Sequence, residues 1–480
     1  MGLQDTLKTL VHKSHLSDVS RHLKHRIEQG LEQRVKLAVT GLSRSGKTVF
    51  ISALARHLQQ SDQGLSLPFF SAAADGRIIG TRDCSHESAI PFPLQTTLAG
   101  LQASPPHWPA STDQLSEVKL ALRYRRSPGL GRMLGEHTTL YLDLIDYPGE
   151  WLLDLPMLEW SFATWCRQQQ ALFFASPRLE ASREWLTCQQ QLDWLAPADD
   201  TQFQQLAHTF RDLLQQLREP PYCLSLLQPG RLLMPGDLSD SPLLNLFPIL
   251  TDLPANPDQA APDSLYSRLK STYYAYREHA VRPFYEDHFR HFDRQIVLVD
   301  CLKTLNRGEA CFTDMQQALN TLLHSFHYGH NSLLRRLVRP RISRVLFAAT
   351  KADHVTANQH HNLDRFLQLL VESAQREIRF EQVETHCLAI ASLRATSAAQ
   401  AKLDGQYLSC LRGHRKDNGE EMALFPGEVP VELPRAEDWN SERFRFVDFA
   451  PRPLPVGPLR PEHHIRLDQA LEYLLGDLLQ

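Results

Sequence analysis

The stretch with the clearest chemistry is Gly41-Leu-Ser-Arg-Ser-Gly46-Lys47-Thr48, which has the spacing G-x-x-x-x-G-K-[ST]. An alternating apolar run precedes it at residues 34–40, and residues 49–58 after it have helical spacing. A strand, a glycine-rich loop and a helix in this order direct backbone N–H groups and the positive end of the helix dipole toward an anion. The pattern therefore predicts a phosphate-binding loop.

Two side chains of this loop have defined roles in binding a nucleoside triphosphate. Lys47 would neutralise charge on the β and γ phosphates, and the Thr48 hydroxyl would complete the oxygen shell of a Mg²⁺ ion. The other nucleotide-binding residues predicted in the loop are Ser43, Arg44, Ser45, Gly46 and Val49.

A second site follows the run TTLYLDLI at residues 138–145, which indicates a buried strand. Asp146 ends this run, and a carboxylate at a core strand end beside a phosphate loop can hold Mg²⁺ through a water molecule. Gly149 provides a flexible backbone N–H that can meet a γ phosphate and release it. The predicted metal ligands are therefore Thr48 and Asp146.

A third site decides the base. The buried run RVLFAA at residues 344–349 ends in Thr350-Lys351-Ala352-Asp353. The Asp353 carboxylate can accept hydrogen bonds from guanine N1–H and N2–H₂, whereas adenine presents an acceptor at N1 and has no N2 amine. The aliphatic stem of Lys351 can lie over the base while its ammonium stays hydrated. This site therefore predicts guanine.

Two weaker signals complete the predicted site. A strand expected at residues 384–391 ends at Ser392 and Leu393, where a backbone N–H could meet guanine O6. The segment 61–109 is irregular by its glycine and proline content, which is typical of a nucleotide-dependent switch. One threonine in or beside it would reach Mg²⁺, and the candidates are Thr81, Thr96, Thr97 and Thr112.

These sites need a sheet whose strand ends meet at one edge. Further strands are expected at residues 118–124 and 295–301, so we predict an α/β fold in which a mostly parallel sheet carries helices on both faces and binds its ligand at the C-terminal strand ends. Residues 203–217 and 265–279 have helical spacing, within a largely helical region. That region predicts an inserted α-helical domain.

The 480 residues allow two or three domains. A Pro- and Gly-rich excursion at residues 402–458 contains a strand-like FRFVDF at 444–449, and residues 464–479 form a core-facing helix. The expected division is an N-terminal amphipathic helical arm at 1–33, a first core part at 34–170, the helical insert at 171–290 and a second core part at 291–480.

Composition bounds the class of protein. With 42% hydrophobic residues, 22% charged residues and a net charge of −4, the chain is typical of a soluble globular protein without the basic footprint of nucleic-acid binding. No apolar run reaches about 18 residues, so no membrane span is expected. The eight cysteines form no C-x-x-C pair and indicate reduced thiols. The basic arm either packs on its own globule or lies on a membrane surface or partner.

The motifs GLSRSGKT, DYPGEW, TKAD and ASLR appear in the sequence order of a Ras-like GTPase. The longer strings DYPGEWLLDLP and VLVDCLKTLNRG resemble the YcjX family of bacterial stress-associated P-loop GTPases, over most of the chain. The resemblance implies a Ras-like core, GTP and GDP binding with Mg²⁺, low intrinsic hydrolysis and a link to envelope stress. It also implies a protein effector or a membrane protein of the YcjF type, met through the helical domain or the arm, and a location in the cytoplasm or at the periphery of the inner membrane.

Two residues depart from the small-GTPase pattern. Glu150 stands where those enzymes usually carry the glutamine that orients water, and an ionised carboxylate there would be repelled by a γ phosphate unless protonated or paired. Arg44 is larger than the residues common at its place, and either contacts phosphate or points to solvent. We therefore expect slow hydrolysis that needs a partner, since an added arginine contributes about 10³–10⁵ in rate. The candidate catalytic residues are Lys47, Arg44 and Glu150.

Two other interpretations stay open. The chain could be an ATP-using enzyme in which the residues of TKAD form only a loop. It could also be a scaffold that holds a nucleotide without hydrolysing it and acts through its helical domain and arm.

Overall fold

The computed structural model describes residues 33–42, 45–63, 66–110, 113–127, 135–324, 342–380, 383–403, 406–439 and 444–480. The predicted arm up to residue 32, together with Ser43, Arg44 and Thr112, lies outside these described residues.

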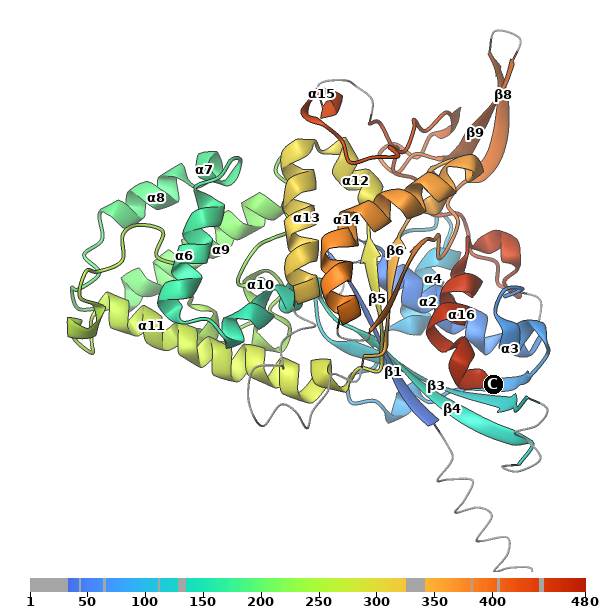
Figure 1. Ribbon diagram of the computed structural model, residues 1–480, viewed down its shortest axis with the longest axis horizontal. Helices are drawn as coiled ribbons and strands as arrows, with labels where there is room; N and C mark the ends of the chain where they lie inside the picture. The colour runs from blue at the N-terminus through green and yellow to red at the C-terminus, as the bar shows by residue number, and fades with distance from the viewer. Residues whose placement is uncertain are drawn as a thin grey trace, which may run out of the picture.

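A seven-stranded sheet in the order β2-β3-β4-β1-β5-β6-β7 forms the core (Figure 1). Its central strand, β1 (Gln33–Gly41), pairs in parallel with β4 (His137–Asp146) on one side and with β5 (Arg294–Val299) on the other. The remaining parallel pairs and the two antiparallel pairs involve β6 (Arg344–Ala349), β7 (Glu384–Ala389), β3 (Ser116–Arg125) and β2 (Ile78–Asp83). The predicted mostly parallel sheet is confirmed.

Helices cover both faces of this sheet because alternate residues of its strands are buried on opposite sides. Val35, Leu37 and Val39 of β1 share one apolar cluster, whereas Ala38 between them belongs to the other. The first face is covered by α2 (Lys47–Gln59), α4 (Leu94–Gln102) and α16 (Leu467–Leu475), and the second by α12 (Cys301–Asn306), α13 (Glu309–His324) and α14 (His360–Phe380). The fold is an α/β core in which a mostly parallel sheet carries helices on both faces.

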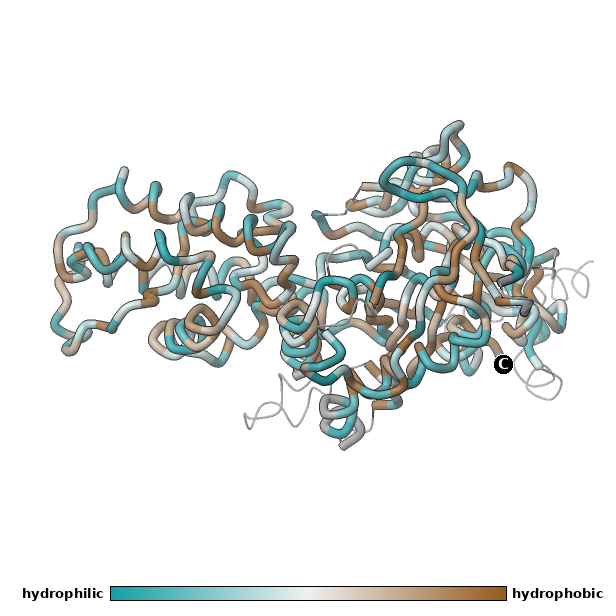
Figure 2. Tube along the Cα trace, turned by 90° about the horizontal axis from the view of Figure 1, so that it is seen from above, coloured by the Kyte–Doolittle hydropathy of each residue, from teal (hydrophilic) through white to brown (hydrophobic). Residues whose placement is uncertain are grey.

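A helical layer lies between β4 and β5 in the chain and beside the sheet in space (Figures 1 and 2). After the 3₁₀ segment η3 (Gly149–Leu158) it contains α6 (Phe162–Phe173), α7 (Arg178–Ala181), α8 (Arg183–Gln190), α9 (Asp200–Arg218), α10 (Gly230–Leu233) and α11 (Leu265–Tyr276). The helices predicted at 203–217 and 265–279 are thus present, as α9 and α11. The predicted boundary at residue 171 stays a prediction.

The longest insert helix, α9, shows why this region is helical. Asp199 caps it by accepting a hydrogen bond from the Gln202 N–H at 2.7 Å. Its buried side chains then recur every three or four residues, which gives one apolar face to the insert core. They are Phe203, Leu206, Ala207, Phe210, Leu213, Leu214 and Leu217.

The insert leaves the sheet at the C-terminal end of β4 and returns at the N-terminal end of β5, so it spans the whole height of the sheet. Its return is fixed at Asp293, whose side chain accepts the Lys36 N–H at 2.9 Å and whose N–H donates to Lys36 O at 3.0 Å. Within the described residues, no helix has both the length and the apolar character that crossing a bilayer requires.

Two local predictions were wrong. The segment 61–109, predicted irregular, contains α3 (Ser71–Ala74), β2 and α4. Its glycines and prolines punctuate these elements: Gly76, at φ 63°, ends α3, and Pro93 sits at the N-cap of α4, where no helical hydrogen bond is lost.

The second error concerns residues 444–449, predicted as a strand. In this region the chain forms a separate antiparallel sheet of β8 (Ser397–Leu403), β9 (Gln406–His414) and β10 (Glu421–Leu424), which projects from the core (Figure 1). Residues 444–449 form no strand, and Phe449 makes only an isolated bridge with Arg415. The backbone of Phe446 bonds to the Asn306 side chain instead of a ladder.

Candidate functional site

The phosphate-loop sequence joins β1 to α2, as its spacing predicts. Gly46 has φ 92°, a left-handed conformation that favours glycine, and its carbonyl accepts the Phe50 N–H at 2.9 Å to begin α2. A Cβ on Gly41 would lie 2.6 Å from Leu298 O and would also meet Ser45 Oγ. Both glycines of the motif are therefore required by the backbone path.

Lys47 is buried, and its ammonium donates a hydrogen bond to Gly41 O at 3.0 Å. This contact holds the cation inside the loop rather than in solvent. It places a positive charge where the N-terminus of α2 also points its free N–H groups.

A cavity of about 510 Å³ runs from this loop toward the C-terminal ends of β6 and β7. We call the part lined by Ser45 to Val49 the loop end. The far end is the part lined by Lys351, Asp353, His354, Ala391, Ser392, Leu393 and Ala395. Nine of the predicted site residues line this one cavity: Ser45, Gly46, Lys47, Thr48, Val49, Lys351, Asp353, Ser392 and Leu393.

At the far end, Asp353 lies in the turn after β6 and is only 3% exposed. Its Oδ2 accepts the Ala395 N–H at 2.6 Å, and its carbonyl oxygen accepts a hydrogen bond from the Thr396 hydroxyl. Both contacts come from the segment that follows β7. The carboxylate is therefore held in one orientation by the neighbouring strand end.

The Lys351 ammonium lies between two carboxylates, 2.7 Å from Asp300 Oδ2 and 2.7 Å from Asp448 Oδ1. Burial opposes the charge on Lys351, yet the two carboxylates raise its pKa above the ordinary value. Burial alone would raise the pKa of Asp448, but the Lys351 ammonium lowers it to about 2. Lys351 and Asp448 are therefore both charged near neutral pH.

The residues after β4 approach the loop from its other side. Asp146 is fully buried and stands opposite Val39 in the β1–β4 register. A Cβ on Gly149 would lie 2.6 Å from Gly41 O, so this glycine packs directly on the phosphate loop. Asp146, Gly149 and Glu150 are absent from the described lining of the 510 Å³ cavity.

Glu150 is 4% exposed, and its Oε2 has no hydrogen-bond partner among the described residues. Gly230 of the insert covers it, since a Cβ on Gly230 would lie 2.6 Å from Glu150 C. The insert therefore covers one side of Glu150, the residue at the position where small GTPases carry the water-orienting glutamine.

Asp154 fastens the insert to this segment. Its Oδ1 and Oδ2 accept the Gly230 N–H at 2.8 and 2.9 Å, and Oδ2 also accepts the Tyr276 hydroxyl at 2.5 Å. Burial raises the pKa of Asp154 to about 6, although the Tyr276 hydroxyl and the Gly230 N–H act to lower it.

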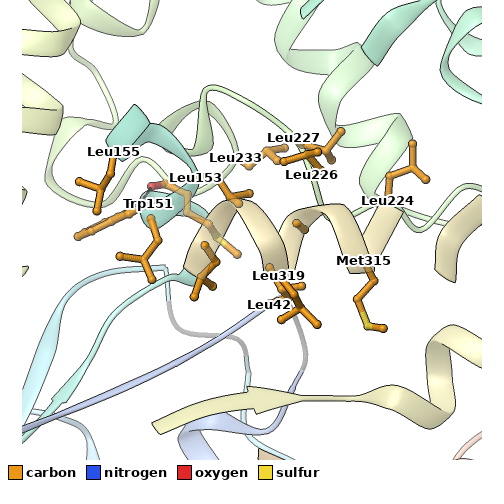
Figure 3. Close-up of a cluster of buried hydrophobic side chains, with 14 of the residues drawn as sticks. Leu42, Trp151, Leu153, Leu155, Leu224, Leu226, Leu227, Leu233, Met315 and Leu319 are labelled. Carbon is orange, nitrogen blue, oxygen red and sulfur yellow. Dashed lines mark hydrogen bonds between the residues drawn. The ribbon is translucent and has the colours of Figure 1, made fainter. Parts of the chain in front are cut away.

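An apolar cluster joins the phosphate loop, η3, the insert and α13 (Figure 3). Leu42 comes directly after the first loop glycine and packs in the same cluster as Trp151 and Leu319. The other side chains labelled there are Leu153, Leu155, Leu224, Leu226, Leu227, Leu233 and Met315. Displacement of η3 would therefore disturb both the insert and α13.

The three described switch candidates do not line the cavity. Thr81 lies in β2, and Thr96 and Thr97 lie in α4. Trp108, Pro109 and Ala110 do line it, so the predicted switch segment reaches the cavity at its C-terminal end.

Several lining residues were missed from the sequence: Trp108, Met234, Lys303, Arg307, His354, Lys416, Asp448 and Phe449. Lys303 had a usable signal, because α12 begins directly after the C-terminal end of a predicted parallel strand. Lys416 and Asp448 had none, since they reach the site from a projecting sheet and an irregular segment.

The model of the YcjX-like family, DUF463, matches residues 35–479. The chain belongs to this family. The Ras-like GTPase YcjX of Escherichia coli strain K12 is 42% identical over 459 residues, which is 95% of this chain and 98% of that protein. The Ras-like GTPase YcjX of Shewanella oneidensis is 38% identical over 498 aligned positions, which cover all of both chains.

Among solved structures, the signal recognition particle receptor SRb-GTP/SRX complex from Chaetomium thermophilum matches 75% of this chain and 93% of that chain. Its sequence identity to this chain is 17%, and the TM-score is 0.26. The fold assignment rests on the sheet and loop described above.

Proposed function

We propose that this member of the YcjX-like family is a guanine-nucleotide-binding switch that hydrolyses GTP slowly with Mg²⁺. The observation that carries the proposal is the single cavity lined by the phosphate-loop residues and by Lys351 and Asp353. The two relatives named Ras-like GTPase align over nearly the whole chain and support it.

At the loop end, the backbone N–H groups from Ser45 onward and the Lys47 ammonium would bind the β and γ phosphates. Thr48 and Asp146 would serve the metal, because hydroxyl and carboxylate oxygens suit Mg²⁺. Within the described residues no three His, Cys, Asp or Glu side chains gather as a metal cluster, so the ion would depend mainly on phosphate and water oxygens. Gly149 would offer its N–H to the γ phosphate from its place on Gly41.

At the far end, Asp353 would accept the N1–H and N2–H₂ of guanine. Its Oδ2 is already fixed by Ala395, which supports a prearranged carboxylate and so discrimination against adenine. The Lys351 stem would lie over the base, and a backbone N–H at Ser392 or Leu393 would meet O6.

We further propose Lys47, Arg44 and Glu150 as catalytic residues of a slow reaction. The enclosed Glu150 carboxylate, with Oε2 lacking a partner in the described structure, supports slow hydrolysis because it is not arranged like a water-orienting amide. An activating partner, a YcjF-type membrane protein, a stress role, a peripheral inner-membrane location and the domain division at 34–170, 171–290 and 291–480 stay proposals that rest on the family resemblance and the sequence.

The test is nucleotide competition on the purified full chain with Mg²⁺. A fluorescent GDP analogue is displaced by GDP, GTP, ADP or ATP, and phosphate release from GTP is followed in parallel. Displacement by guanine nucleotides at much lower concentration, with slow phosphate release, supports the proposal. Equal or better displacement by ATP identifies an ATP-using enzyme, and tight GTP binding without phosphate release identifies a scaffold.

A further inference from the structure

The two carboxylates that hold Lys351 come from different parts of the chain. Asp300 directly follows β5 and caps α12, where it accepts the Lys303 N–H at 3.1 Å. Asp448 belongs to the 444–449 segment, which returns from the projecting β8–β10 sheet. The second partner is therefore supplied from outside the α/β core.

The 444–449 segment is fixed to the core at its N-terminal side. Phe446 donates its N–H to Asn306 Oδ1 at 2.8 Å and accepts the Asn306 side-chain N–H at its carbonyl, 2.5 Å away. Asn306 is the last residue of α12, so this part of the segment is tied to the helix that Asp300 caps.

The C-terminal side of the segment is fixed at the cavity. Phe449 is buried, and its ring meets His354 edge-on with centroids 5.1 Å apart. Its carbonyl accepts the Trp108 indole N–H at 2.9 Å. Asp448 thus sits between the turn that carries Asp353 and the end of the predicted switch segment.

A lysine stem has several rotatable bonds, and it covers a ligand face well only when its ammonium is held. Lys351 has a left-handed backbone at φ 61° in the turn after β6. Asp300 alone would hold the ammonium on the side of α12. Asp448 adds a second anchor, so the stem between them has a fixed course along the cavity wall.

We propose that Asp448 is a positioning residue for the nucleotide: by anchoring Lys351 it fixes the lysine stem over the base, and it thereby slows nucleotide release. The inference rests on the proposed function, because it concerns the base end of the same cavity. It adds a determinant of nucleotide retention that no phosphate-loop or TKAD residue supplies.

The experiment uses the full chain with Asp448→Asn and follows release of a fluorescent GDP analogue into excess GDP. Loss of one charge-assisted hydrogen bond to Lys351 should speed release about tenfold, equivalent to ~1.4 kcal/mol. Asp448→Glu keeps the charge and should restore most of the retention. Asp417→Asn is the matched control, since Asp417 is exposed on the same projecting sheet and pairs with Arg415.

A ligand without a base distinguishes a purely structural role of Asp448 from the proposed role in holding the base. Inorganic triphosphate competes for the loop end alone, so its affinity should be unchanged in Asp448→Asn while that of GDP falls. Unchanged GDP release, equal weakening of GDP and triphosphate, or failure of Asp448→Glu to restore retention would each overturn the inference. Failure of the wild-type chain to bind GDP would instead overturn the proposed function itself.

Discussion

At the loop end of the cavity five consecutive residues, Ser45 to Val49, form the lining, whereas the rest of the lining, the far end included, comes from segments as distant as Lys303, Asp353, Leu393 and Asp448. The loop end needs only a strand, a turn and a helix to exist. The far end needs the sheet order, the return of the chain after β7 and the projecting sheet to be in place first. Under the proposed function, anion binding would therefore be a local property of this chain, and choice of base would be a property of the whole fold.

The largest expected effect is that of Lys47→Ala, which removes the proposed phosphate-binding ammonium from the loop end. Removal of an ammonium that bonds phosphate should weaken GDP binding about a hundredfold or more, since each charge-assisted hydrogen bond is worth about 1.5–3 kcal/mol. Equilibrium titration with a fluorescent GDP analogue measures it, with Lys402→Ala on the exposed strand β8 as control. Unchanged affinity in Lys47→Ala would show that the loop is not the phosphate site.

Asp353→Asn tests the far end without touching the loop end. The Asn amide can still accept the Ala395 N–H through its oxygen, but its NH₂ group would face the guanine donors. GDP affinity should fall about ten- to a hundredfold, that is by ~1.4–2.7 kcal/mol. Xanthosine diphosphate, which has an oxygen at C2, should gain affinity. Inorganic triphosphate should bind as before, and a parallel loss would mean that the two ends are not independent.

The substitution Gly149→Ala tests whether the loop end depends on the segment that follows β4. The new Cβ would lie 2.6 Å from Gly41 O, so backbone must move, and overpacking of this kind costs about 1–3 kcal/mol. A lower melting temperature with weaker GTP than GDP binding is expected. Gly457→Ala is the matched control, because no atom lies within 4 Å of the Cβ it would carry.

The smallest expected effect concerns the insert that closes over Glu150. The pKa of Asp154 is raised from 3.8 in the unfolded chain to about 6, so the unfolded state loses its proton first and stability falls as pH rises through 6. Between pH 5 and pH 7 the free energy of unfolding should drop by about 1 kcal/mol from this group. Denaturant titrations of Asp154→Asn should lack that drop, and an identical pH slope in both proteins would contradict it.

The same contrast explains what the sequence could predict. The strands at residues 344–349 and 138–145, and the two glycines and the helix start of the phosphate-loop motif, are signalled by local runs and spacing, and the structure has them in place. The meeting of Lys351 and Asp353 with the loop followed from the rule that parallel strands bring their C-terminal ends to one edge.

Asp448 and Lys416 could not be found in this way. The aromatic alternation of FRFVDF favours a strand, but Phe446 and Phe449 are buried against the core, and their backbone groups bond to Asn306 and Trp108. Tertiary contacts override the local pattern there. In the segment 61–109, glycine and proline content hid β2, which is stabilised by pairing with β3, and the helices α3 and α4.

The two ends of the insert lie at opposite edges of the sheet. Its first residues leave the sheet beside the phosphate loop, and its last residues are hydrogen-bonded through Asp293 to Lys36 at the opposite edge. The insert is therefore held to the sheet by the hydrogen bonds of Asp293 at one end, and at its other end it follows Gly149, which packs on Gly41. A displacement of η3 at Gly41 would consequently be passed to α9 and α11, whose buried side chains belong to the same apolar cluster.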